Sequence, residues 1–275
     1  MINPHSAPRS PTPAPGWAAP PRFQRPGVLS FLAYLVALAF LVLALEGSQI
    51  SVTGFFEGLP HMADLLARMV PPDVSRLAPI GRALLETFQM ALVGTVLGVL
   101  FSLPLAVWAT RRLTPHPVVY YAARGLISWF RTVPDLIWAL FFVVTVGLGP
   151  FAGTLALMVD TMGFCGKFFA EAMEETESGP QEALTALGAG RSGIICSAVM
   201  PAALPSFINT SLFSLEKATR SSVVLGLVGA GGIGIELKVA MDLFEYPTAA
   251  TIILCIFALV LAVERLSSSL RQRIL

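Results

Sequence analysis

Charged residues are scarce in this chain, and their scarcity argues against an ordinary soluble domain. Asp, Glu, Lys and Arg make up 13% of the 275 residues, which is roughly half the share typical of soluble proteins. Hydrophobic residues make up 55%, and the mean hydropathy is +0.74. The formal net charge is only +1, so the charge balance gives no indication of nucleic-acid binding. The composition therefore predicts an integral membrane protein.

Histidine and cysteine are also few, which leaves little material for metal binding or catalysis. The three cysteines, Cys165, Cys196 and Cys255, lie far apart without metal-ligand spacing, so we interpret them as reduced thiols in the membrane. The three histidines are scattered through the tail and the loops. No paired-carboxylate motif and no Gly-x-Ser-x-Gly sequence is present. We therefore predict no metal site, no cofactor on this chain and no catalytic centre.

A phosphate-binding loop is absent as well, although one glycine-rich run invites that interpretation. Residues 229–234 read Gly-Ala-Gly-Gly-Ile-Gly, but they follow a predicted membrane helix rather than a strand, and no Lys-Ser/Thr pair follows them. The glycines allow a break in the helix and a close approach of the backbone. Two interpretations stay open. Either the N–H groups at Gly231 and Gly232 meet an anion, or these glycines only allow tight packing.

Long apolar runs dominate what is present. Val28–Leu45 holds 18 uncharged residues and Thr87–Thr110 holds 24, and each is long enough to cross a hydrocarbon layer of roughly 30 Å as a helix. The first run is too long for a signal peptide and lacks a clear cleavage site, so we predict a retained helix. The predicted fold class is all-α, a polytopic membrane protein with six spans. These spans are 28–47, about 82–110, 131–147, about 151–173, about 202–228 and about 244–265.

The spans divide the chain into four parts. Residues 1–27 hold eight prolines and too few apolar residues for a core, so we predict a disordered cytoplasmic tail. Residues 28–47 form the first span, and residues 48–80 form a periplasmic segment whose apolar spacing is typical of an interfacial helix. Residues 81–270 form the main membrane domain, which a polar loop at 179–201 interrupts.

Lysine and arginine predict the orientation through the short loops that they occupy. If the N-terminus is cytoplasmic, the opposite side collects only Arg68, Arg76 and Lys238, with Arg82 at the boundary. The cytoplasmic side then collects ten arginines: Arg9, Arg22, Arg25, Arg111, Arg112, Arg124, Arg191, Arg265, Arg271 and Arg273. We therefore predict that both termini and the polar loop at 179–201 are cytoplasmic.

The polar loop is predicted to form a helix, a glycine break and a second short helix. Gly179-Pro180 ends the preceding helix and starts a new one, because proline suits a first helical turn. Gly188 and Gly190 end that helix. Pro201 starts the next apolar segment. A helix pair of this kind at a membrane surface suits docking against a soluble partner.

The spacing of this loop resembles a known motif. The order Glu182-Ala183-Leu184, then Gly188, then Pro201 is similar to the EAA loop of permease subunits in ABC importers. In that family the loop reads Glu-Ala-Ala, then Gly, then Ile-x-Leu-Pro. Three residues depart from that pattern but keep an apolar side chain, namely Leu184, Ala198 and Met200.

Ionisable residues inside the predicted spans are candidates for function, because a charge is unfavourable in a membrane. The span at 202–228 carries Glu216, Lys217 and Arg220. Glu216 and Arg220 are four residues apart, so they share a helix face and can pair. Either they only neutralise each other, or Arg220 and Lys217 offer positive charge to a substrate. Asp160, in the span at 151–173, is expected to have a partner on another helix.

Three further stretches extend the resemblance over roughly residues 80–270. They are Arg131-Thr-Val-Pro-Asp-Leu-Ile-Trp138, Gly163-Phe-Cys-Gly-Lys-Phe-Phe-Ala-Glu-Ala172, and Val224-Leu-Gly-Leu-Val-Gly-Ala-Gly-Gly-Ile-Gly234. All three resemble the permease subunit of phosphonate ABC importers. The proline-rich tail and residues 48–79 match no family that we can name.

The resemblance implies a type I (MetI-like) permease core and an importer of phosphonate or a related phosphorus oxyanion in a bacterial inner membrane. It also implies four kinds of partner: a second copy of this or a similar permease, a dimer of cytoplasmic ATPase subunits that binds ATP, a periplasmic binding protein, and membrane lipid. The chain itself is then not an enzyme. We assign to the substrate pathway the residues Arg131, Thr132, Pro134, Glu216, Lys217, Arg220, Gly231 and Gly232.

Other functions stay open at this point. The solute is also compatible with phosphite, a phosphate ester or an amino acid. An ion-coupled secondary transporter is an alternative from another class, but we find no convincing inverted repeat. The polar loop at 179–201, which we call the docking loop, would have no role in such a transporter. A membrane-bound enzyme of phospholipid metabolism would need a catalytic cluster that the sequence does not show.

Overall fold

The computed structural model describes residues 27–48 and 50–274, and within these ranges it contains helices and connecting loops but no strand. The all-α prediction is confirmed. The predicted disordered tail at 1–27 lies, apart from Gly27, outside the described residues. The chain divides into two compact units, Met1–His61 and Met62–Leu275, which we describe separately.

The first unit contains one long apolar helix. Helix α1 (Val28–Gly47, 20 residues) has no charged side chain before Glu46, and its sequence is apolar on every face. Such a helix suits a lipid environment on all sides. Helix α2 (Val52–Arg68) begins in this unit and continues across the division of the chain. Its apolar and polar residues segregate to opposite faces, and its bounds agree with the interfacial helix expected there.

The second unit is a bundle built around two closely packed helices, α3 (Leu77–Ala109) and α6 (Pro150–Glu174). Their contact depends on small residues. A Cβ atom added at Gly94 would lie 2.8 Å from the Cβ of Leu157, and one added at Gly98 would overlap Thr161. Small residues allow membrane helices to approach closely, and the many contacts that follow stabilise the pair.

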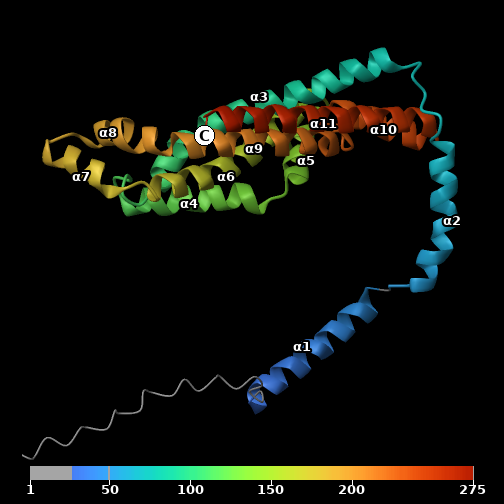
Figure 1. The fold of residues 1–275 in the computed structure, drawn as a ribbon, viewed down its shortest axis with the longest axis horizontal. Helices are drawn as coiled ribbons and strands as arrows, with labels where there is room; N and C mark the ends of the chain where they lie inside the picture. Colours follow the sequence, from blue (N-terminus) through green and yellow to red (C-terminus); the bar gives the residue numbers. More distant parts are fainter. Residues whose placement is uncertain (1–26, 49, 275) are drawn as a thin grey trace, which may run out of the picture. The chain divides into compact units, whose positions relative to one another are not determined.

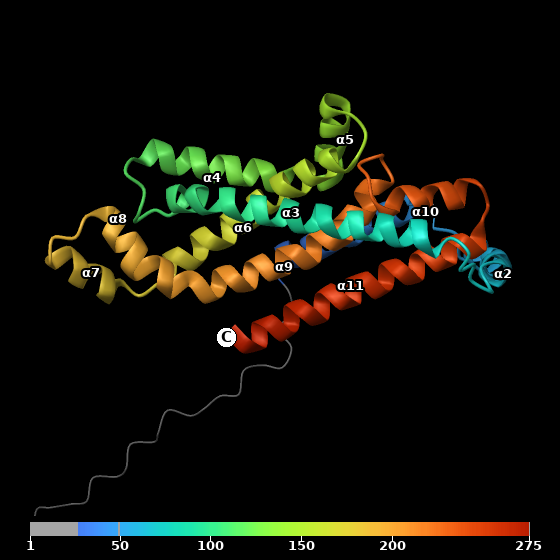
Figure 2. The same cartoon turned by 90° about the horizontal axis from the view of Figure 1, so that it is seen from above.

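The remaining long helices pack around that pair. Helix α9 (Met200–Gly226) lies along α6 and α3, and α11 (Tyr246–Ile274) lies along α9 (Figures 1 and 2). The short helices α7 (Ser178–Ala186) and α8 (Arg191–Ile194) form one end of the bundle. Helix α10 (Ile233–Asp242) lies toward the other end, where α11 begins. Helix α9 therefore connects the two ends.

The predicted third span was wrong at its start. We expected a helix from Arg131 to Gly147, but α4 (Pro117–Thr132) ends there and α5 (Asp135–Val146) follows after a bend of 91°. Pro134 explains the bend, because proline disfavours helical conformation in the residue before it, and Val133 is extended. No span was predicted over residues 118–130, whereas the amphipathic helix α4 buries Ala123 and Ile127 against the bundle.

Within residues 27–48 and 50–274, four helical segments are long and apolar enough to cross a membrane, and the bent α4–α5 pair is a fifth candidate. The four are α1, α3, the continuous run Arg191–Gly226 and α11. The remaining predicted span corresponds to α6, which has 25 residues but carries Asp160, Lys167 and Glu171. Charged residues in a predicted span are unfavourable in a membrane, so those of α6 are of functional interest.

Candidate functional site

The loop between α6 and α9 forms as the sequence predicts. Helix α7 ends at Ala186, and Gly188 then adopts φ +77°, a left-handed conformation that glycine adopts without strain. The N–H of Gly188 donates to the carbonyl oxygen of Thr185 at 3.0 Å, and the N–H of Ala189 donates to that of Leu184 at 3.0 Å. These bonds satisfy the last carbonyl groups of α7 and fix the angle at which the chain leaves it.

The outer face of this loop is open to solvent. Glu182 and Ala183 are exposed, and Leu187 is 84% exposed. Within the part of the chain that the structure describes, Glu182 makes no ion pair. An apolar side chain beside a carboxylate without a partner is typical of a surface that another protein covers.

The same loop is joined rigidly to the bundle. Helix α8 continues through one turn of π-helix (Ile195–Val199) into α9, so that Arg191–Gly226 forms one continuous helical run of 36 residues. Pro201 follows the π-helical turn closely, and Pro205 lies one turn farther along α9. The loop is therefore continuous with α9, which extends into the bundle.

Two ionisable residues of α9 find partners on other helices. The ammonium group of Lys217 donates to both carboxylate oxygens of Asp160 on α6, at 2.8 Å each. The ammonium also lies 5.4 Å from the centre of the Phe164 ring. The expectation that Asp160 has a partner on another helix is confirmed. Because Asp160 neutralises Lys217, this lysine offers less free charge than the sequence suggested.

The pairing of Glu216 with Arg220 is not formed, and this expectation was wrong. Glu216 is 8% exposed and instead pairs with Arg271 near the end of α11. Arg220 is exposed and makes no ion pair with any carboxylate of the described residues. A spacing of four residues places two side chains on one helix face, but α11 lies close enough to bring a competing arginine to Glu216.

The glycine run after α9 is closed by the protein's own groups. The N–H of Gly232 donates to the Glu86 carboxylate of α3 at 2.7 Å, and the N–H of Ile233 donates to the Thr87 hydroxyl at 2.7 Å. A Cβ atom at Gly231 would lie 2.7 Å from the backbone nitrogen of Pro150. The Gly232 N–H thus meets a carboxylate of the protein itself, and Gly231 is tightly packed; a role of this run in the substrate pathway stays a prediction.

The motif at 131–138 lies at the bend between α4 and α5. Arg131 and Thr132 end α4, and Pro134 precedes α5; all three are exposed. Arg131 is about one turn beyond Ile127, which is buried against α6. This group and the α9 residues occupy different helices.

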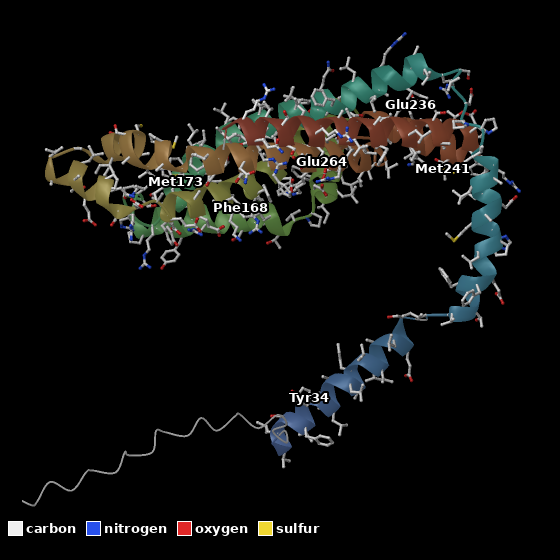
Figure 3. The ribbon with its side chains drawn as sticks, in the orientation of Figure 1. Tyr34, Phe168, Met173, Glu236, Met241 and Glu264 are labelled. Atoms are coloured by element: carbon white, nitrogen blue, oxygen red, sulfur yellow. The ribbon has the colours of Figure 1, made fainter. Side chains whose placement is uncertain are left out.

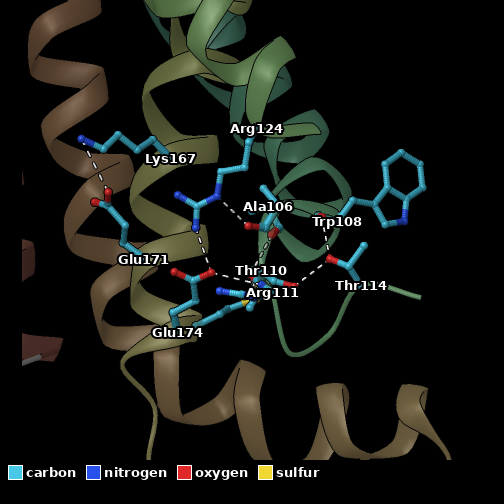
Figure 4. A network of polar contacts seen from close by, with 11 residues as sticks. Ala106, Trp108, Thr110, Arg111, Thr114, Arg124, Lys167, Glu171 and Glu174 are labelled. Atoms are coloured by element: carbon cyan, nitrogen blue, oxygen red, sulfur yellow. Dashed lines mark hydrogen bonds and ion pairs between the residues drawn. The ribbon is translucent and has the colours of Figure 1, made fainter. Parts of the chain in front are cut away.

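One polar network was missed by the sequence interpretation. Arg124 of α4 donates to Glu174 at the end of α6 at 2.8 Å and to the carbonyl oxygen of Ala109 at 2.8 Å (Figure 4). The same carboxylate oxygen of Glu174 accepts the N–H of Arg111 at 3.1 Å. Glu174 and Arg124 are fifty residues apart in sequence, and helical periodicity predicts pairs only between residues a few positions apart.

Side chains drawn on the whole chain show where these groups lie (Figure 3). Phe168 and Met173 mark the half of α6 that leads to α7, whereas Glu236 and Met241 mark α10 near the opposite end of the bundle. The ion pairs of Lys217 and Glu216 lie between these two ends, on the helix that joins them. The arrangement is that of an exposed loop, a helix continuous with it and paired charges inside a helical bundle.

Comparisons with known proteins agree with this arrangement. A protein family described as the binding-protein-dependent transport system inner membrane component matches residues 84–275. The phosphite transport system permease protein PtxC of Stutzerimonas stutzeri is 39% identical over 240 residues, which cover 86% of this chain and 87% of that protein. The phosphate-import permease protein PhnE of Mycolicibacterium smegmatis is 40% identical over 223 residues, covering 81% of this chain and 42% of that longer protein.

A solved structure shares the fold. An inward-facing conformation of the MetNI methionine ABC transporter superposes with a TM-score of 0.65 and 24% identity, covering 74% of this chain and 99% of that one. At this identity the likeness concerns the fold alone. The MetI-like fold of the helical bundle is thereby confirmed.

Proposed function

The chain belongs to the family of binding-protein-dependent transport system inner membrane components, and we propose that it is the permease subunit of an ATP-driven importer of a phosphorus oxyanion. Phosphonate and phosphite are the solutes that we favour. The support for this class of solute is the relative named as a phosphite permease, whose 39% identity extends over 86% of this chain.

The observation on which the proposal depends is that the exposed loop at 179–201 is continuous with the long helical run that includes α9. Glu182 and Leu187 are exposed at one end, and the run Arg191–Gly226 leads from that end to Lys217 and Arg220. A cytoplasmic ATPase dimer that grips the loop would move α9 as a rigid body when it closes. Movement of packed helices around a central path gives alternating access.

The chain supplies no ATP-binding motif, so hydrolysis belongs to the partner subunits in this proposal. The permease pairs with a second copy of itself or a similar subunit, and a periplasmic binding protein delivers the solute. The arginine distribution supports an inner-membrane orientation with both termini in the cytoplasm. ATP-dependent uptake by vesicles containing this chain, the ATPase and the binding protein tests this division of labour, and hydrolysis by the purified chain alone would refute it.

Arg220 is the residue that we assign to the solute anion. A phosphonate carries between one and two negative charges near neutral pH, and an anion without a counter-charge is unfavourable in a membrane. Lys217 is neutralised by Asp160 and Glu216 by Arg271, whereas Arg220 is exposed and unpaired in the described chain. A single accessible guanidinium provides attraction without the tight binding that would prevent release.

Arg220→Gln tests this assignment. We expect uptake at low solute concentration to fall about tenfold, which corresponds to the loss of one charge-assisted contact. Assembly with the ATPase and solute-independent ATP hydrolysis should remain. Arg273→Gln is the matched control, because Arg273 is also an exposed arginine, near the end of α11, and makes no ion pair with a described residue. Equal uptake by Arg220→Gln and the wild type would exclude Arg220 from the pathway.

A further inference from the structure

Three cationic side chains line one small pocket between α4 and α6, away from α9. The pocket has a volume of about 90 Å³. That volume is roughly the space of three water molecules, which suits a tetrahedral oxyanion of five heavy atoms. Its lining residues are Arg124, Ile127, Ser128, Arg131, Lys167 and Ala170. Nothing in the transport mechanism proposed above uses this pocket.

The charges around the pocket do not cancel. Arg124 pairs with Glu174 at 2.8 Å, and Lys167 pairs with Glu171 at 3.5 Å (Figure 4). Arg131 makes no ion pair with any carboxylate of the described residues. The three cations and two carboxylates leave one net positive charge, and an anion with one negative charge would balance it.

The backbone beneath Arg131 holds its side chain in place. Gly163 of α6 faces the stem of Arg131, and a Cβ atom at this glycine would lie 3.1 Å from the arginine Cγ. The aliphatic part of the arginine is therefore packed on α6, which leaves only the guanidinium free to reorient. A side chain held in this way loses little conformational entropy when it binds an anion.

The outer face of α4 has the composition of a membrane–water interface. Tyr121 is 70% exposed and Trp129 is 55% exposed, with Val118 and Leu126 between or beside them. Tyrosine and tryptophan are enriched at the depth of the lipid headgroups. Basic pockets between membrane helices on the cytoplasmic side suit lipid headgroups. The pocket and this aromatic face belong to the same helix, α4.

We propose that this pocket binds the phosphate of an anionic lipid headgroup, with Arg131 as the residue that supplies the unpaired charge. A phosphatidylglycerol phosphate carries one negative charge, which matches the net charge of the pocket. The shared chemistry is a tetrahedral phosphorus oxyanion, so a free solute anion is the other source to be tested. The proposal does not depend on which solute the protein transports.

Native mass spectrometry of the full-length permease in a zwitterionic detergent tests the proposal with short-chain phosphatidylglycerol and phosphatidylcholine as probes. The wild type should bind phosphatidylglycerol about tenfold more tightly than phosphatidylcholine, because one charge-assisted contact accounts for about that factor. Arg131→Gln should lose this preference while keeping the aliphatic stem that packs on Gly163. Arg131→Lys, which retains the charge, should keep most of it.

Arg112→Gln is the matched control, since Arg112 is exposed in the loop before α4 and does not line the pocket. Its lipid preference should equal that of the wild type. If Arg131→Gln does not fold, as judged by thermal unfolding, Lys167→Gln reports on the same pocket. Unchanged phosphatidylglycerol preference in folded Arg131→Gln, or in Lys167→Gln where it replaces that variant, would overturn the proposal. Displacement of phosphatidylglycerol by millimolar methylphosphonate would overturn the lipid source and assign the pocket to a free oxyanion.

Discussion

The glycine-rich turn before α9 and the one after it differ in how closely their glycines are packed. A Cβ atom added at Gly188 or Gly190, before α9, would meet no atom within 4 Å. One added at Gly226, the last residue of α9, would lie 2.7 Å from the carbonyl oxygen of Gly231. Glycine is needed at Gly188 for its backbone conformation alone, whereas Gly231 and Gly232 also have positive φ and in addition lie against other segments of the chain, so they are needed for both reasons.

The polar groups of the two turns also differ, in whether the chain itself provides their partners. After α9, the N–H groups of Gly232 and Ile233 are satisfied by Glu86 and Thr87 of α3. Before α9, Glu182 is exposed and has no ion-pair partner in the described chain. One end is closed by the chain itself, and the other is exposed, as the proposed docking of an ATPase subunit requires. The comparison indicates that mutations at the first end should affect folding, and those at the second should affect assembly.

The largest effect should follow from Gly234→Ala. The new methyl group would overlap the carbonyl oxygen of Val223, and a backbone atom cannot move aside without disturbing α9. We expect a loss of about 3 kcal/mol in the free energy of unfolding, the upper part of the usual range for overpacking. Thermal unfolding in detergent micelles measures it. Gly125→Ala in α4 is the control, because its Cβ would meet no atom within 4 Å.

Gly188→Pro and Glu182→Lys should abolish transport while the bundle stays folded. Proline requires φ near −65°, but Gly188 has φ +77°, and its N–H bond to Thr185 would also be lost. Lysine at position 182 reverses the charge that we expect to meet polar or basic groups of the ATPase. Co-purification with the ATPase subunit and ATP-dependent uptake are the measurements. Full transport by both variants would contradict the docking assignment, and unfolding of both would contradict the comparison of the two ends.

These two predictions differ in how much of their basis the sequence contains. The docking loop could be predicted, because glycine, proline and glutamate recur there at fixed spacing within a single stretch of chain. The role of Gly234 as a packing residue could not, since the atoms that it touches depend on how the chain folds back after α9. The long helices were predictable from apolar length, except that amphipathic α4 was too polar to suggest a span, and the short α10 lies between two predicted spans where no helix was expected.

The ion pairs also show what sequence spacing does not predict, namely the partner of each ionisable group. Glu216 and Arg220 share a helix face, so local spacing predicts a pair, but Arg271 takes that carboxylate from a separate helix. The expectation that Asp160 has a partner on another helix was confirmed, because a buried carboxylate needs a counter-charge. Nothing in the sequence singles out Lys217 as that partner. Sequence patterns report which groups need a partner, and only the packing of helices decides which partner they find.

Removal of one threonine hydroxyl should lower the stability more in the contact after α9 than in the docking loop. Thr87→Val removes the acceptor for the N–H of Ile233 from a fully buried position, so we expect a loss of about 1–3 kcal/mol in stability. Thr185→Val, in the docking loop, removes an exposed bond to the carbonyl oxygen of Gln181 that water replaces, and should change stability by less than about 0.5 kcal/mol. Equal losses in reversible unfolding would mean that the docking loop is as closed as the turn after α9.

The smallest effect concerns two glycines of the docking loop, each changed to alanine. Neither new methyl group meets an atom within 4 Å, so packing does not distinguish Gly188 from Gly190. Their backbones do. Gly190 precedes α8 with φ −70° and ψ 163°, an ordinary extended conformation. Alanine restricts the unfolded chain there but is a poorer helix cap than glycine, and these two small contributions oppose each other.

We therefore expect Gly190→Ala to leave the free energy of unfolding within about 0.5 kcal/mol of the wild type. Gly188→Ala should lower it by about 1 kcal/mol, because an L-residue is strained at φ +77°. Unfolding curves of the two variants, recorded under identical micelle conditions, measure the difference directly. If both alanines were neutral, the turn would be free to relax, and the fixed angle between α7 and α8 could not transmit the movement of an ATPase into α9.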